Sequence, residues 1–448
     1  MKFRSTHILL LALITIVIIG IIANFIITSQ RAIINRPPDI EILVTGKMRG
    51  RFEFCGCPGE RAQSLPMRAQ AIKGLTLTPQ LRERLLLIES GNFTSDRESV
   101  EVAMRSFKML GYDLVSTAQS EQFYIDEVLS QARKLNMKLL ARDIKGNEGL
   151  SDICKPVWVL SRSQYKVAFV TSGIQPKSND ERTVMAKWNE VMNDVKSASG
   201  NTNAVILMNY WDWGLIERVL KETDAGKFIT AIITHTSAQQ LNRPEFQTNF
   251  ETHFLLLPER LLPMPLLRLW IHRGKVRHLN MTTYSPSVEI PDEEIKMLVS
   301  AYYRKRQERL KAQWLTIVRR AKEYTTPKEC AKCHESEYRH WMTTKHATAV
   351  LTLKKRHRIE PDCLKCHSEE FIQTKRLTMT DKGSGVECVS CHVELKDPVK
   401  VKEHGHMPSE RARPPRIDPI KVCTPCHDKE HSPQFDVKLS DYMSKVRH

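Results

Sequence analysis

The chain has 448 residues, of which 41% are hydrophobic and 27% are charged. This length and apolar content predict two to three packed domains and exclude a disordered or fibrous protein. The formal net charge is +17, but residues 323–448 carry 23 Lys and Arg against 19 Asp and Glu, so most of the excess lies upstream.

The N-terminus carries an uncharged apolar stretch at residues 8–28, preceded by Lys2 and Arg4. About 21 such residues are enough to cross a bilayer as a helix. A cleaved signal peptide would have a shorter apolar core ending in a small-x-small site, whereas this stretch ends in FIITSQRAII. We therefore predict a membrane anchor over residues 1–36, with one N-terminal transmembrane helix at residues 8–28.

Residues 39–291 show the pattern of an α/β domain. Short apolar runs alternate with helical patterns at residues 99–110 and 125–135, which predicts a sheet covered on both faces. Ligands bind such domains where loops leave the carboxyl ends of strands. The apolar runs lie at residues 40–45, 85–89, 114–116, 166–171, 204–208 and 228–234.

The order of these strands and turns resembles the metallophosphoesterase domain of the periplasmic 5'-nucleotidase type. The similarity rests on VTGKMRG, LLIESGN, GYDLVSTAQSEQF, VILMNYWDWG and AIITHTS, in that order along the chain. The resemblance implies an α/β sandwich. It also implies two metal ions, held in the family by Asp-x-His, Gly-Asp, Gly-Asn-His-Glu, a lone His and Gly-His-x-His.

This chain departs from the family pattern at nearly every metal ligand. One neutral imidazole beside a Lys and an Arg cannot hold two dications. We therefore expect the chain to keep the family fold and to lack phosphoester hydrolysis. The residues at the ligand positions are Lys47 and Arg49, Asn92, then Gln119, Ser120 and Glu121, then Tyr210, and finally His235, which is retained, with Ser237.

Cys55 and Cys57 flank Gly56 in the loop after the first strand. Such a pair can form a tight disulfide or supply two soft metal ligands, and its place on the ligand-binding rim favours a redox or binding role. A structural disulfide is the alternative, with Cys154 either left over or recruited as a partner.

The residue pattern at 292–322 predicts a basic amphipathic helix that connects the two domains. Acidic residues open it at Asp292, Glu293 and Glu294, and apolar residues follow at helical spacing from Ile295 to Val318. Its apolar stripe can pack on a domain, or the helix can contact a membrane surface or haem propionates.

The last third of the chain, residues 323–448, contains four copies of Cys-x-x-Cys-His, the attachment signal for haem c. The two thiols bind the porphyrin vinyl groups and the adjacent imidazole binds the iron. Zinc knuckles would not require a His after each pair. We predict four covalently bound haem c groups, attached through Cys330 and Cys333, Cys363 and Cys366, Cys388 and Cys391, and Cys423 and Cys426, with proximal ligands His334, His367, His392 and His427.

The motif at Cys330, followed by Tyr338, Trp341 and Thr344-Lys345-His346-Ala347, resembles a family of tetrahaem cytochromes. That family includes the electron acceptor of hydroxylamine oxidoreductase. GVECVSCH and CHDKEHSPQF are similar to it as well, although Val393-Glu394-Leu395 replaces the Gly-Pro-Gly that often follows the third motif. The resemblance implies a mainly helical multihaem domain and makes His346 a distal iron ligand. Further candidates are His404, His406 and His431.

These features predict a tetrahaem carrier in the cytoplasmic membrane, single-pass, with most of the chain in the periplasm. It would pass electrons between a membrane redox enzyme and an exported acceptor, both unidentified redox partner proteins. The alternative is an oxidoreductase that acts on a small nitrogen or sulfur species at an open haem. About eight haem propionates would make residues 323–448 mildly acidic, so we expect no nucleic acid partner.

Overall fold

The computed structural model describes residues 35–53, 64–142, 144, 150–178, 180–235, 243–258, 263–285, 290–317, 325–375, 385–405, 418–428, 432 and 434–447. The predicted membrane anchor at residues 8–28 lies outside these ranges. Within them, every helix is too short or too polar to span a bilayer.

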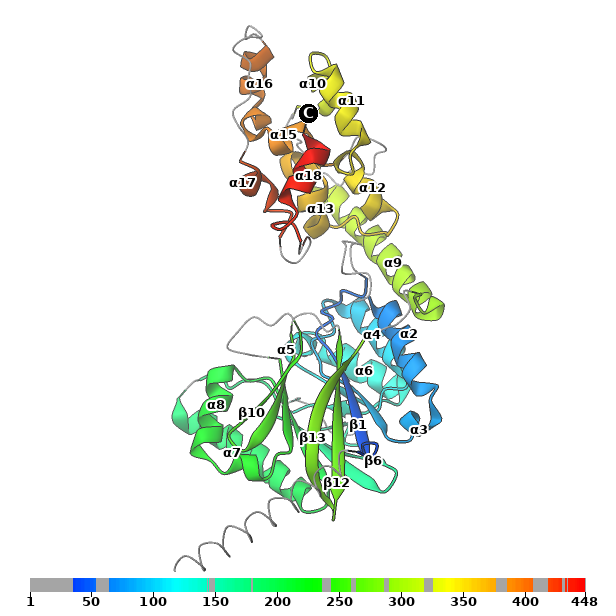
Figure 1. The fold of residues 1–448 in the computed structure, drawn as a ribbon, viewed down its shortest axis with the longest axis vertical. Coiled ribbons are helices and arrows are strands. Elements are labelled where there is room, and N and C mark those ends of the chain that lie inside the picture. Colours follow the sequence, from blue (N-terminus) through cyan, green and yellow to red (C-terminus); the bar gives the residue numbers. More distant parts are fainter. Residues whose placement is uncertain are drawn as a thin grey trace, which may run out of the picture. The chain divides into compact units, whose positions relative to one another are not determined.

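The chain divides into two compact units (Figure 1). Unit 1 comprises Met1–Arg51 and Ala69–Val288, and unit 2 comprises Phe52–Arg68 and Glu289–His448. Unit 2 therefore combines the C-terminal third with a short segment from early in the sequence. From the sequence this segment belongs to the predicted α/β domain of residues 39–291, because nothing in its residues distinguishes it from a surface loop.

Unit 1 contains two mixed sheets, which confirms the α/β part of the predicted fold class. Their strand orders are β13-β12-β1-β2-β3-β4-β5 and β10-β11-β9-β8-β7-β6. In the first sheet the strands from β1 to the edge strand β5 are parallel, and in the second the parallel strands lie between two antiparallel edge strands. The strands are β1 (Ile40–Thr45), β2 (Leu85–Glu89), β3 (Leu114–Ser116), β4 (Leu139–Leu140), β5 (Cys154–Lys155), β6 (Val157–Arg162), β7 (Tyr165–Thr171), β8 (Ala204–Asn209), β9 (Ala231–Thr234), β10 (Glu245–Asn249), β11 (Thr252–Leu256), β12 (Met264–His272) and β13 (Lys275–Tyr284).

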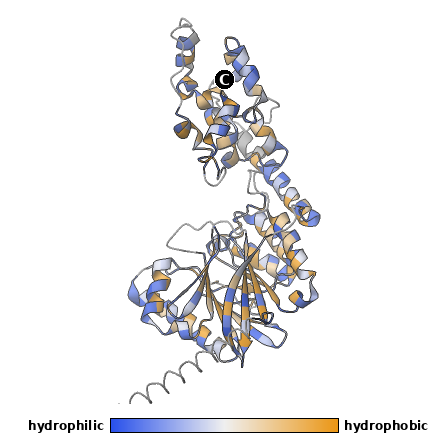
Figure 2. Cartoon of the chain, viewed as in Figure 1, coloured by the Kyte–Doolittle hydropathy of each residue, from blue (hydrophilic) through white to orange (hydrophobic). Residues whose placement is uncertain are grey.

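The two sheets pack against each other through an apolar core. Ile42 and Val44 of β1 share this core with Phe169 of β7 and Ile206 of β8. The opposite face of the second sheet packs on helices, which fits the hydrophobic colouring along the strands (Figure 2). The apolar runs alone predict one sheet between helix layers, because a strand is apolar on both faces whether helices or another sheet cover it. The resemblance implies a sandwich, and the pair of sheets agrees with it.

Helices cover the outer faces of the sandwich, and α4 and α7 begin at side-chain caps. The Asp96 side chain accepts from Ser99 N at the start of α4, and Gly111 ends that helix in the left-handed region. The helices of this part of the chain are α2 (Leu65–Thr76), α3 (Pro79–Arg82), α4 (Arg97–Leu110), α5 (Gln119–Gln122), α6 (Ile125–Leu135), α7 (Glu181–Ser199), α8 (Trp213–Glu222) and the 3₁₀ turn η2 (Ala225–Lys227).

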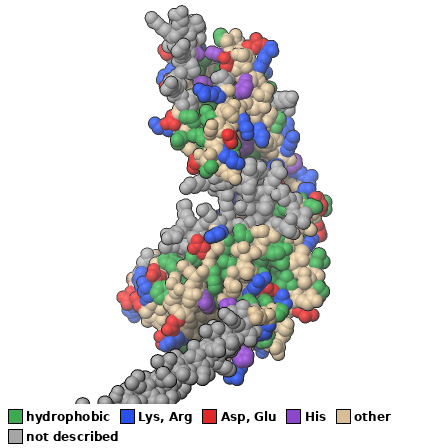
Figure 3. All heavy atoms as spheres, viewed as in Figure 1, with side chains coloured by type: hydrophobic (Ala, Val, Ile, Leu, Met, Phe, Trp, Pro, Cys, Tyr) green, Lys and Arg blue, Asp and Glu red, His purple; other side chains and the backbone are tan. Residues whose placement is uncertain are grey.

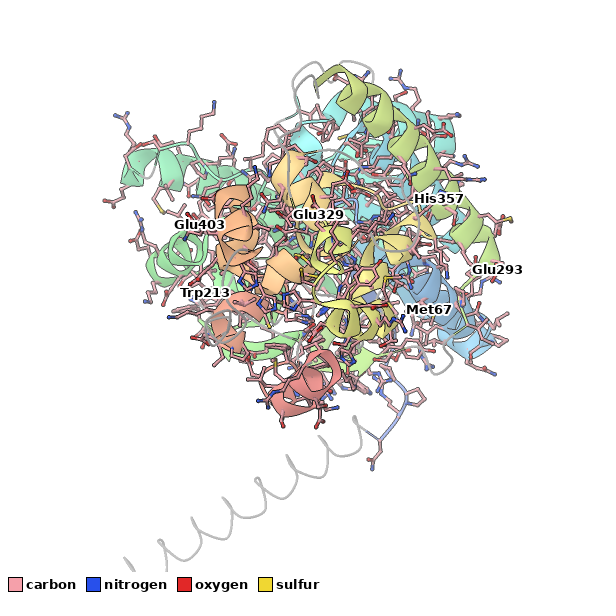
Figure 4. All side chains as sticks on the ribbon, turned by 90° about the horizontal axis from the view of Figure 1, so that it is seen from above. Met67, Trp213, Glu293, Glu329, His357 and Glu403 are labelled. Carbon is pink, nitrogen blue, oxygen red and sulfur yellow. The ribbon has the colours of Figure 1, made fainter. Side chains whose placement is uncertain are left out.

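Unit 2 is helical in its described residues and opens with the long helix α9 (Glu293–Ile317). Asp292 caps α9 by accepting from Ile295 N, and Glu293, labelled in Figure 4, begins it. The remaining elements are α10 (Pro327–Cys330), α11 (Glu335–Thr343), η3 (His346–Thr348), α12 (Ala349–Lys354), α13 (Pro361–His367), α14 (Glu369–Thr374), α15 (Cys388–Cys391), η4 (Val393–Lys396), α16 (Pro398–Gly405), α17 (Pro419–Cys423) and α18 (Leu439–Val446).

Candidate functional site

Each Cys-x-x-Cys-His motif of unit 2 lies on a single helical turn. The second motif fills the end of α13, and in the other three the His N–H donates to the carbonyl of the first Cys, at 2.8–2.9 Å. One turn brings residues three and four apart to the same side, so both thiols and the imidazole can face one porphyrin. The local geometry therefore fits covalent haem c.

The four motifs converge through their cysteines. Cys330 of the first motif contacts Cys388 of the third, and this hydrogen bond lowers the pKa of the Cys330 thiol to about 7. Cys366 of the second motif contacts Cys426 of the fourth, which raises the pKa of Cys426. Burial raises the pKa of Cys391 to about 11, with a further contribution from Cys423 of the fourth motif.

The two cysteine hydrogen bonds and the proximity of Cys391 to Cys423 put the motifs in the spatial order first, third, fourth, second. A covalent porphyrin starts at each cysteine pair, so neighbouring haems in this order would lie close together. The arrangement suits a chain of electron carriers.

Two pairs of histidines have the spacing expected across an iron atom. The ring centroids of His334 and His404 are 5.9 Å apart, and those of His346 and His427 are 6.1 Å apart. With metal–nitrogen distances of about 2.0–2.1 Å, two imidazoles on one metal have centroids about 6 Å apart. The fold thus pairs two motif histidines with two of the predicted distal ligands, whereas His406 and His431 lie outside the described residues.

Hydrogen bonds orient the motif imidazoles. His427 Nδ1 lies 2.9 Å from Ser432 Oγ, and His367 Nδ1 lies 3.0 Å from the Ala349 carbonyl. A partner at Nδ1 fixes the ring and leaves Nε2 for the metal. Histidine side chains also reach the face of unit 2 that Figure 3 presents.

The apolar packing of unit 2 involves few side chains. One cluster of described residues consists of Val350, Leu353, Ile359, Leu364 and Phe371. This small cluster fits the expectation that porphyrins form much of the interior, since about 30 residues per haem cannot supply an ordinary core.

A second set of candidate residues, which we call the rim, meets at the strand ends of unit 1 and comprises Lys47, Asn92, Glu121, Tyr210 and His235. Sharp turns follow β1 and β2, where Lys47 (φ 53°) and Asn92 (φ 56°) adopt the left-handed conformation. The fold brings both side chains to His235, which follows β9, and to Tyr210, which follows β8. Ser237 lies outside the described residues and Arg49 is exposed.

Lys47 is buried with its ammonium group inside this rim. Its Nζ donates to the carbonyls of His235 at 2.8 Å and Leu257 at 3.0 Å. A buried ammonium needs such partners, because an unpaired charge away from water is very costly. Lys47 therefore joins the turns after β1, β9 and β11.

His235 lies in a hydrogen-bonded chain with a defined tautomer. Asn92 Oδ1 accepts from Ser120 N, so its Nδ2 donates to His235 Nδ1 at 2.9 Å. The remaining proton of His235 sits on Nε2, which lies 2.9 Å from Ser90 Oγ. Burial and the nearby charges of Lys47 and Arg49 hold the pKa of His235 well below its ordinary value, so the imidazole is neutral.

Glu121 organises the same rim, a role that its sequence position did not reveal. Its fully buried carboxylate accepts hydrogen bonds from four backbone N–H groups and one hydroxyl. The donors are Asn92 N, Phe93 N, Thr94 N, Ala118 N and Ser120 Oγ. From the sequence, Glu121 is only one of the residues at the family's metal-ligand positions, and its burial and acceptor role become visible only in the fold.

The rim residues do not fit a pair of dications. Lys47 places a positive charge among them, and the nitrogen atoms of His235 are engaged with Asn92 and Ser90. Within the described ranges, no three His, Cys, Asp or Glu side chains are grouped as a metal centre requires. No step of metal-assisted hydrolysis can be built from this arrangement.

We accordingly predict no phosphoester hydrolysis by the full chain. Incubation with manganese or zinc should leave the turnover of nucleotides and model phosphodiesters at background, and should not raise the melting temperature. Turnover that disappears in His235→Ala would contradict this prediction.

Because His235 is neutral in the folded protein, we expect the stability of unit 1 to fall in acid. Its pKa is lowered in the folded protein, so below about pH 6.5 the unfolded chain binds a proton that the folded chain excludes. The free energy of unfolding of unit 1 should fall by up to about 1.4 kcal/mol per pH unit below that value. Hydrogen exchange of the rim amides between pH 7 and 5 should show this loss, and His235→Gln should remove the His235 share of it.

The upstream region contains three further cysteines. Cys55 and Cys57 lie outside the described residues. Cys154 begins β5 and is buried, which raises the pKa of its thiol to about 11. A buried thiol with a high pKa is unreactive.

Comparison with known proteins supports the haem assignment. Residues 329–393, which include the first three motifs, match the family described as "Cytochrome c554 and c-prime". This region is thus a haem c cytochrome, which confirms the resemblance drawn from its sequence. No curated protein matches the chain as a whole.

Comparison with solved structures found similar chains at low sequence identity. The sulfate thiohydrolase SoxB of Thermus thermophilus, in complex with glycerol, has 13% identity and a TM-score of 0.45, over 61% of this chain and 62% of that one. The calcineurin-like phosphoesterase YfkN of Bacillus subtilis has 12% identity and a TM-score of 0.40, over 60% of this chain and 98% of that one. This chain therefore spans less than two thirds of the SoxB chain.

Proposed function

We propose that the chain is a membrane-anchored, periplasmic tetrahaem cytochrome that transfers electrons between a membrane redox enzyme and an exported acceptor. The observation that carries this proposal is the pairing of His334 with His404 and of His346 with His427. An iron with imidazoles on both faces has no position for a substrate, so at least two haems serve electron transfer.

The order of the motifs supports a path for the electrons. The hydrogen bonds of Cys330 with Cys388 and of Cys366 with Cys426, and the proximity of Cys391 to Cys423, support a haem order of one, three, four, two. An electron that enters at the first haem would leave at the second, or the reverse. The bound haems supply the redox chemistry, and the polypeptide supplies their attachment, spacing and axial ligands.

The proposed location rests on the sequence. The apolar stretch at residues 8–28 supplies a single-pass anchor in the cytoplasmic membrane, and haem c attachment takes place outside that membrane. The redox partners would meet the chain in the periplasm.

Two measurements on the purified full chain test the proposal. Mass spectrometry of the denatured protein should show four haem masses on one polypeptide, and fewer would contradict the haem count. Optical and electron paramagnetic resonance spectra should show low-spin iron. A high-spin haem that binds carbon monoxide, nitrite or hydroxylamine would instead favour the enzyme, and capture of membrane partners would identify the donor.

A further inference from the structure

A buried arginine lies beside the attachment site of the second haem. Arg358 is in the turn between α12 and α13, next to His357, which Figure 4 labels. Its side chain is 11% exposed, and Nη2 approaches Cys363 Sγ at 4.0 Å. With a haem attached through Cys363, as proposed above, this guanidinium would lie beside the thioether that holds it. A thioether sulfur remains a weak acceptor for such a donor.

Contacts on every side hold the guanidinium in place. Nε donates to Glu360 Oε1 at 2.7 Å, and Nη1 donates to the Glu53 carbonyl at 2.8 Å. The group also lies over the ring of Tyr303, 4.3 Å from its centroid. The Tyr303 hydroxyl in turn accepts from Phe52 N at 3.0 Å.

The charges around this group are not balanced. Glu360 pairs with Arg358 through one oxygen and with Arg306 through the other, at 3.3 Å. The Glu53 carboxyl faces Arg358, with three further basic groups around it: Arg356, Lys296 and His357. Cations therefore outnumber carboxylates around Glu53 and Glu360, and Arg358 brings one of these cations to the Cys363 sulfur.

We propose that Arg358 sets the reduction potential of the haem attached through Cys363 and Cys366. The ferric porphyrin carries one more positive charge than the ferrous form. A fixed cation at its edge disfavours the ferric form and raises the potential, and burial limits the screening of this effect by water and salt. The proposal rests on the proposed function, since it takes this haem to be one of the electron carriers.

The test is a potentiometric titration of the full chain with its haems attached, followed by optical absorbance. Arg358→Gln should lower the midpoint potential of one of the four components. At a fixed potential, the ratio of reduced to oxidised haem for that component should fall about tenfold. For a one-electron couple this is 59 mV. Glu360→Gln removes the carboxylate and leaves both guanidinium groups, so the same component should move upward. Arg339→Gln, on the exposed surface of α11, should move none.

Shifts of opposite sign in the two variants would not arise from a purely structural role. If Arg358→Gln retains all haems and leaves every midpoint in place, the proposal is overturned. If that variant does not assemble, Glu360→Gln carries the test, and an unchanged titration there overturns the proposal equally. Haem count and spin state test the electron-carrier function separately, so a failure of either idea is recognisable.

Discussion

Replacing His346 by alanine should convert one of the four haems from low-spin to high-spin while all four remain covalently attached. The centroid of its ring is 6.1 Å from that of His427, which suits two ligands of one iron, and Cys423 and Cys426 hold the porphyrin without it. Electron paramagnetic resonance should show a new high-spin signal, and carbon monoxide should bind the reduced protein at one haem. His404→Ala should do the same at the iron of His334, and the double variant should open two haems.

A control variant is available in the same unit. His357 has a left-handed backbone (φ 54°), which asparagine also accepts, so His357→Asn should leave the spectra unchanged. The ligand assignment fails if His346→Ala keeps four low-spin haems, or if a high-spin haem already present in the wild type is unaffected.

Replacing Glu121 by alanine should destabilise unit 1 by about 3–5 kcal/mol. The substitution leaves four buried backbone N–H groups without their acceptor, and each such loss costs about 1–3 kcal/mol before the structure relaxes or water enters. Hydrogen exchange should show lost protection at Asn92, Phe93, Thr94 and Ala118 first.

Glu101 provides the matched control for this change. It is a half-exposed glutamate on α4, paired only with Arg105 in the next turn, so Glu101→Ala should cost less than about 1 kcal/mol. Equal stability of the Glu121 and Glu101 variants would show that the rim does not depend on the buried carboxylate.

Local patterns in the sequence predicted most elements of unit 1. The run at residues 40–45 became β1 (Ile40–Thr45), and the helical pattern at residues 125–135 became α6 (Ile125–Leu135). These predictions succeed because apolar spacing within one element reports its own burial. The second sheet as a separate layer follows from the family resemblance and not from these local patterns, since a strand's sequence does not specify what covers it.

The haem sites divide in the same way. Attachment cysteines and proximal histidines are local and follow from the motif. The distal ligand that we propose is not local: His404 lies 70 residues further along the chain than His334, and the spacing of the two rings is visible only in the fold. Glu121 was missed for a related reason, because its acceptor role depends on the turn after β2.

The segment Phe52–Arg68 makes the two units interleaved along the chain, and this determines when each can be completed. Phe52 is fully buried in unit 2, and its N–H donates to Tyr303, 251 residues later. During synthesis Phe52–Arg68 can pack only after α9 has been made, and this contact closes a loop of about 250 residues between Phe52 and Tyr303. A fragment beginning at residue 289 would lack Phe52, and loss of a buried Phe side chain alone typically costs about 3–5 kcal/mol. Truncating the chain at one position therefore does not yield the complete haem unit, which comprises Phe52–Arg68 as well as Glu289–His448.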